Sequence, residues 1–180
     1  MTYEEYPINK KGTDYVVGDI HGEYQKLISQ LYRIGFDKEK DRLFSVGDLI
    51  DRGPDNLKCL GLIEEPWFHA VCGNHEDMML TSSPYWYPNG GDWHHSEVEN
   101  ASSEIKKHYN RLFKKAKALP YAITVYTEYG SVGICHAQPP TNDWEDVAMG
   151  NCSHYHIQEM MWGRSDVKNV RPPVDNVTYT

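Results

Sequence analysis

The sequence has few cysteines, no long apolar run and a deficit of positive charge. Its four cysteines, Cys59, Cys72, Cys135 and Cys152, are widely spaced and include no Cys-x-x-Cys pair, which argues against a zinc finger or a disulfide framework. No apolar run is long enough to cross a bilayer, and the first five residues carry two glutamates where a secretory signal would carry positive charge. We therefore expect a cytoplasmic protein without a membrane partner.

The charge balance sets further limits. With 18 Lys and Arg against 26 Asp and Glu, the net charge is −8, which argues against a nucleic-acid partner bound through a broad basic face. An anionic substrate must therefore be attracted by charges at its binding site and not by the net charge of the protein. At 180 residues and 39% hydrophobic content the chain can form one domain with a real core. We expect a single domain over 1–180, with an irregular polar tail at 165–180.

Strand-like and helix-like segments alternate along the first half of the chain. Short apolar runs at 15–17, 43–46 and 68–71 predict buried strands, and apolar residues at helical spacing predict helices over 24–34 and 56–64. This alternation is typical of an α/β fold with a mostly parallel sheet. Farther along we expect an aromatic-rich loop at 81–97 that could line a substrate cleft, an amphipathic helix at 97–119, and a β-hairpin at 121–135.

Glycine and a metal-binding side chain follow directly after several of these strands. The stretches are Gly-Asp-Ile-His-Gly at 18–22, Gly-Asp-Leu-Ile-Asp-Arg-Gly at 47–53, Gly-Asn-His-Glu at 73–76 and His136 after the hairpin. Loops from several strands converge at the carboxyl ends of an α/β sheet. Oxygen and imidazole ligands without thiolate suit Mn²⁺, Fe²⁺ or Zn²⁺, and a shared carboxylate suits a pair of ions. Asp51 and Arg52 would then serve a bound anion and its proton donor.

Each motif alone has a plainer interpretation. An aspartate between strand and helix is often an N-cap, Asn74-His75 alone would be a turn, and Asp51-Arg52 alone would be a surface ion pair. Their repetition after successive strands favours a site. Thiolate phosphatase chemistry, a zinc-protease motif, a phosphate-binding P-loop and a Gly-x-Ser-x-Gly elbow are all unsupported by the sequence. The other histidines are interpreted as structural or surface groups: His69, His94, His95, His108, His154 and His156.

Taken in this order, the motifs resemble the phosphoprotein phosphatase branch of the metallophosphoesterases, and within it the small phage and bacterial serine/threonine phosphatases of the bacteriophage lambda type. The resemblance covers about residues 15–164. It implies a β-sandwich flanked by helices and a centre of two divalent ions, Mn²⁺ first, with Fe, Zn or Ni as alternatives. It also implies hydrolysis of a phosphoprotein or a phosphorylated small molecule by direct attack of a metal-bound hydroxide.

The resemblance also implies a role for each motif residue. Asp19 and His21 would bind the first ion, Asp48 would bridge, and Asn74 and His136 would bind the second. His75 would be the general acid, oriented by Asp51. The phosphate would be held by Arg52 and Arg164.

One departure leaves alternatives open. The family continues into a Gly-His-Thr segment whose histidine completes the second metal site, whereas no histidine follows Arg164. We therefore expect that the C-terminal part is missing; the alternatives are that water, or less plausibly His154 or His156, completes the second site. With only Asp48, Asn74 and His136, the second ion should bind more weakly. Two other functions stay open: a diadenosine tetraphosphate hydrolase that reuses the same motifs, and an inactive metal-binding remnant.

Overall fold

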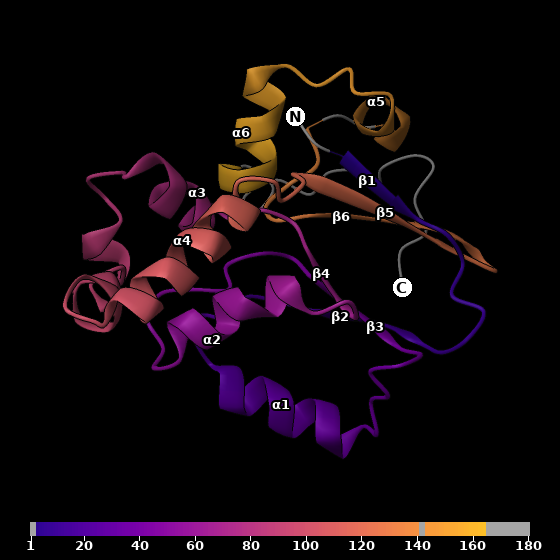
Figure 1. Ribbon diagram of the computed structural model, residues 1–180. Coiled ribbons are helices and arrows are strands. Elements are labelled where there is room, and N and C mark those ends of the chain that lie inside the picture. Colours follow the sequence, from indigo (N-terminus) through magenta and orange to yellow (C-terminus); the bar gives the residue numbers. More distant parts are fainter. Residues whose placement is uncertain (1–2, 141–142, 165–180) are drawn as a thin grey trace.

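The computed structural model describes residues 3–140 and 143–164 (Figure 1). Within these residues the strands form two three-stranded sheets, ordered β1-β5-β6 and β2-β3-β4. The second sheet is wholly parallel, whereas the first pairs β1 parallel and β6 antiparallel to β5. The expected 165–180 tail lies outside the described residues. No helix in the described part is long and apolar enough to cross a membrane.

The element boundaries follow the expected alternation in the first half of the chain. The strands are β1 Tyr3–Tyr6, β2 Asp14–Val17, β3 Arg42–Ser45, β4 Phe68–Ala70, β5 Ala122–Thr127 and β6 Gly130–Cys135. The α-helices are α1 Tyr24–Arg33, α2 Asn56–Gly61, α3 Asn74–Thr81, α4 Ser103–Ala116, α5 Trp144–Ala148 and α6 His154–Trp162. Short 3-10 helices lie at Leu62–Glu64 and Tyr87–Asn89, and a π-helix lies at His95–Glu99.

The two sheets pack face to face, and each outer face is covered by helices. Alternate residues of β3 point to opposite faces: Leu43 joins the core beneath α1, α2 and α4, and Phe44 joins Ile123 and Ile134 between the sheets. On the far side, α5 and α6 cover β5 and β6 (Figure 1), and Trp144 lies in that core. This layering confirms the expected α/β fold with a β-sandwich flanked by helices.

Several local predictions differ from the structure. The predicted helix at 97–119 begins later, at Ser103, because the Ser102 hydroxyl accepts a hydrogen bond from the backbone N–H of Ile105 at 3.4 Å and caps it. The prediction of a buried strand is wrong for Val16, whose exposed fraction is 58%. β1, α5 and α6 are not among the elements predicted from the sequence. The β1 sequence, Tyr-Glu-Glu-Tyr, has no apolar pattern and is a strand because it pairs with β5.

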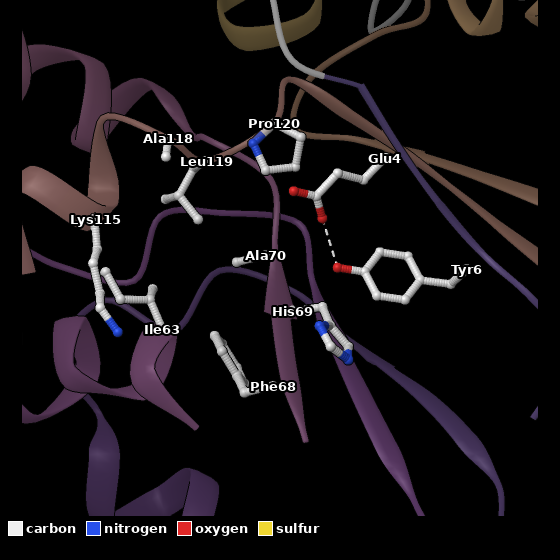
Figure 2. A pocket seen from close by; sticks show the side chains of 10 residues that line it. All are labelled: Glu4, Tyr6, Ile63, Phe68, His69, Ala70, Lys115, Ala118, Leu119 and Pro120. Carbon is white, nitrogen blue, oxygen red and sulfur yellow. Dashed lines mark hydrogen bonds between the residues drawn. The ribbon is translucent and has the colours of Figure 1, made fainter. Parts of the chain in front are cut away.

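A pocket opens where β1, β4 and the end of α4 meet. Figure 2 shows the apolar side chains of Phe68 and Leu119 on one side of it and Glu4, Tyr6 and His69 on the other. The Tyr6 hydroxyl donates to Glu4 at 2.6 Å, and the Tyr6 and His69 ring centroids are 4.4 Å apart. Metal-ligating groups do not gather here among the described residues, because both clusters of that kind lie at the strand ends.

His69 should make the fold sensitive to acid. Burial, and secondarily the charge of Arg42, lower the pKa of His69 from 6.5 to about 4, against a smaller opposing effect of Asp14. A group whose pKa is lowered on folding contributes stability that is complete above pH 6.5 and is lost as pH falls towards 4. In the presence of chelator, His69→Phe should reduce the decline in unfolding free energy over this range by about 1–2 kcal/mol, allowing for solvent screening. Urea titrations at several pH values measure it.

The control for this prediction is His154→Gln, a replacement at an exposed position of α6 that is measured over the same pH range. Equal pH dependence in wild type and His69→Phe would contradict the prediction.

Candidate metal centre

The ends of β2, β3, β4 and β6 bring the predicted ligands to one edge of the sandwich. Because β2, β3 and β4 run parallel, the loops that follow them leave from the same edge. The loops after β3 and β4 touch at Gly47, where an added Cβ would lie 2.6 Å from the backbone nitrogen of Gly73 and where φ is +96°. Only glycine fits this close approach, which holds Asp48 beside Asn74.

Asp48 lies at the centre of the cluster. Its Oδ2 atom is 3.7 Å from His21 Nε2, 3.6 Å from His136 Nε2 and 3.9 Å from His75 Nε2. Asp19 lies on the open side, with one oxygen 3.9 Å from His21 Nε2. Two triads, His21–Asp48–His75 and Asp19–Asp48–His136, each bring their ligand atoms within 4.8 Å of one another.

Backbone carbonyls orient the two predicted histidine ligands. His21 Nδ1 lies 3.0 Å from the carbonyl of Ile50, and His136 Nδ1 lies 2.8 Å from that of Val46. An Nδ1–H that donates to a carbonyl leaves Nε2 as the free lone pair, which is the form that binds a metal. His136 Nε2 also lies 2.8 Å from Asn74 Oδ1, so the two predicted ligands of the second ion point at one place.

The buried carboxylate of Glu76 fixes the backbone around Asp48. Its carboxylate accepts backbone N–H bonds from Asp48 at 2.8 Å, Leu49 at 2.9 Å and Gly73 at 3.0 Å. Burial, and then the charge of Asp48, raise the pKa of Glu76. Glu76 is not among the site residues predicted from the sequence. The signal in the sequence is the position of Glu76 three residues after Gly73, at the start of α3, where a glutamate can accept a backbone N–H bond.

His75, the predicted general acid, is in contact with Asp51, the residue predicted to orient it. His75 Nδ1 lies 2.6 Å from Asp51 Oδ2, and both side chains are buried. Arg52 reaches over the pair, with one terminal nitrogen 3.0 Å from His75 Nε2 and the other 2.8 Å from His21 Nε2. A guanidinium at this place can hold an anion against the ligand cluster.

Backbone strain is concentrated at this edge. Five residues other than glycine have positive φ in the described part of the chain, and four of them are at the site: His21, Asp48, Asp51 and Arg52. Such conformations cost about 1–3 kcal/mol each and persist only where the surrounding structure enforces them. Asn56 enforces one, because its buried side chain accepts the Asp51 N–H at 2.7 Å and donates to Gly53 at 2.8 Å.

Arg164 follows the C-terminal end of α6. Its guanidinium donates to the carbonyl of Gly163, and its side chain is exposed. The end of α6 is anchored beside the site because Trp162 donates to Asp77 at 3.1 Å and Ala137 donates to the carbonyl of Met160 at 2.6 Å. The predicted phosphate contact of Arg164 therefore stays a prediction.

The donor set fits a pair of divalent ions. Carboxylate, amide and imidazole atoms from four strand ends converge around one buried carboxylate, and no thiolate joins these ligands in the part of the chain that the structure describes. His154 and His156, the weaker alternative for the second site, join neither triad. The His156 ring instead accepts a hydrogen bond from Ser153 N at 3.3 Å, at the start of α6.

Comparisons with known proteins agree with the geometry. A family model described as calcineurin-like phosphoesterase matches residues 15–176. "Serine/threonine-protein phosphatase 1" of Salmonella typhimurium is 37% identical over 172 residues, which cover 92% of this chain and 74% of that protein. "Bis(5'-nucleosyl)-tetraphosphatase, symmetrical" of Hamiltonella defensa is 42% identical over 70 residues, covering 38% of this chain and 26% of that protein.

The fold has solved counterparts. A protein serine/threonine phosphatase from Saccharomyces cerevisiae superposes with a TM-score of 0.58 at 20% identity, over 90% of this chain and 52% of that chain. Identity at this level shows a shared fold alone. The chain thus spans about three quarters of the Salmonella relative's length and about half of the solved yeast chain.

Proposed function

This chain belongs to the calcineurin-like phosphoesterase family, and we propose that it hydrolyses phosphomonoesters, with phosphoserine and phosphothreonine in proteins as its substrates. The observation that carries the proposal is Asp48, one buried carboxylate oxygen that faces the Nε2 atoms of three histidines at 3.6–3.9 Å. The most extensive similarity reported above is to a serine/threonine phosphatase, and it supports the choice of substrate.

Family members use a dinuclear metal centre, and the side chains present fit one. Asp19 and His21 would hold one ion, Asn74 and His136 the other, and Asp48 would bridge them. When bound, such a pair supplies a nucleophile from water near neutral pH and stabilises charge on the phosphoryl oxygens. We propose Mn²⁺ as the ion, because oxygen and imidazole donors without thiolate suit it.

The residues around the ligands would carry the proton and the phosphate. Asp51 fixes His75 through Nδ1, which leaves Nε2 to give a proton to the leaving alkoxide of serine or threonine. In the structure the Arg52 guanidinium lies 3.0 Å from His75 Nε2, a contact that requires Nε2 without a proton; with His75 protonated, the guanidinium would turn to the phosphoryl oxygens. The partner class is therefore a phosphorylated side chain or small molecule.

A direct comparison of substrates tests this proposal. With Mn²⁺, the protein should release phosphate from a phosphoserine peptide with a larger kcat/KM than it shows for diadenosine tetraphosphate, since its similarity to the dinucleotide hydrolase covers only 38% of this chain. Phosphate release and separation of the nucleotide products measure both rates. Preferential cleavage of the dinucleotide would replace the phosphoprotein proposal by the second candidate.

A further inference from the structure

We infer that Trp86 and Trp93 are positioning residues of the proposed reaction, which hold Asp51 in the one orientation that presents Oδ2 to His75. This inference rests on the proposed function and extends it to two residues of the aromatic-rich segment 81–97. From the sequence, the aromatic residues of this segment are expected to line a substrate cleft. The structure places both tryptophans in the core instead, with exposed fractions of 5% and 6%.

Both indoles donate to the same carboxylate. Trp93 Nε1 donates to Asp51 Oδ1 at 2.6 Å, and Trp86 Nε1 lies 3.1 Å from Oδ1 and 3.0 Å from Oδ2. His75 Nδ1 lies 2.6 Å from Asp51 Oδ2. Because Trp93 occupies Oδ1, the carboxylate cannot rotate without breaking a buried hydrogen bond, which costs more than an exposed one.

The indoles are themselves held rigidly. The rings of Trp86 and Trp93 meet edge to face with centroids 6.2 Å apart, and Trp93 packs in the same way on Tyr109 of α4. Gly91 permits this packing, because an added Cβ would lie 2.5 Å from Trp86 Nε1. The orientation of Asp51 is thus set by the core beneath α4, through donors that no sequence motif indicates.

The same segment also contacts the backbone of Arg52, the residue that follows Asp51. Gly90 has φ of +106°, and an added Cβ there would lie 2.8 Å from the backbone nitrogen of Arg52. Arg52 N donates to the Gly90 carbonyl at 3.4 Å. One segment therefore fixes the backbone of the proposed phosphate ligand and the carboxylate that orients the proposed acid.

The test replaces Trp93 with phenylalanine, which removes the indole N–H and keeps an aromatic ring. Trp93→Phe should lower kcat about 10- to 100-fold, the usual cost of losing an outer hydrogen-bond partner, with KM and bound Mn²⁺ unchanged. The loss should be larger for phenyl phosphate than for p-nitrophenyl phosphate, because the poorer leaving group depends more on protonation by His75. Trp86→Phe and Gly91→Ala should lower kcat in the same direction by smaller factors and serve if Trp93→Phe does not fold.

Two other buried tryptophans provide matched controls. Trp67 donates to Glu65 at 2.8 Å and Trp144 to Thr124 at 2.7 Å, with exposed fractions of 3% and 5%. Trp67→Phe and Trp144→Phe should leave kcat unchanged. In an Asp51→Asn background, Trp93→Phe should add less than a twofold loss, because its partner carboxylate is already gone.

A readout independent of turnover separates this inference from the proposed function. In the metal-free protein, the Nδ1–H of His75 should give a downfield proton resonance that Trp93→Phe shifts and Trp67→Phe does not. An unshifted resonance, or losses in kcat that are equal for both leaving groups or accompanied by loss of Mn²⁺, would overturn the positioning role. An inactive wild type that keeps the Trp93-dependent resonance would overturn the proposed function alone.

Discussion

Replacing Asp48 with asparagine should remove both metal binding and turnover. The carboxylate is 3% exposed and faces three imidazole Nε2 atoms, so it is the only described side chain common to both triads. An asparagine keeps the shape but loses the charge that two cations would share. Since metal ions contribute several kcal/mol of transition-state stabilisation, kcat/KM should fall roughly 10³-fold or more.

Metal analysis after gel filtration measures the first effect, and phosphate release measures the second. Asp14→Asn is the control, because Asp14 is a partly buried carboxylate engaged by Arg42 at 2.7 and 2.8 Å away from the cluster. That variant should keep its metal. Two ions per chain in Asp48→Asn would contradict the bridging role, and a wild type with one ion or none and no turnover would support the inactive remnant instead.

The sequence predicts the strand ends of this site well because short-range constraints govern them. Glycine at the turn, an apolar strand before it and a polar ligand after it leave few arrangements, and Asp19, Asp48 and His136 converge as expected. The family resemblance drawn from these motifs is confirmed by the match over 15–176.

The parts that the sequence predicts poorly depend on partners far along the chain. Trp86 and Trp93 are 35 and 42 residues from Asp51, and no periodicity marks an indole as a donor to one carboxylate. The same holds for β1, which becomes a strand by pairing with β5 about 120 residues later. Contacts between residues so far apart in the sequence cannot be inferred until the fold is known.

His75→Asn should separate proton donation from metal binding. His75 Nε2 belongs to a triad that could hold an ion, yet Nδ1 is fixed to Asp51 at 2.6 Å, as expected of an oriented acid. If His75 is the acid, the variant should lose about 10²- to 10⁴-fold in kcat with Mn²⁺ content unchanged.

The matched comparison is His21→Asn. Its Nδ1 is held by the Ile50 carbonyl at 3.0 Å, as in a ligand, so this variant should lose metal as well as turnover. Both can be measured by metal analysis beside hydrolysis of phenyl and p-nitrophenyl phosphate. The loss in His75→Asn should be larger for phenyl phosphate, because an alkoxide or phenoxide of high basicity leaves only after protonation. Equal loss of Mn²⁺ in the two variants would mean that His75 is a ligand, and the proton would then have to come from elsewhere in the site.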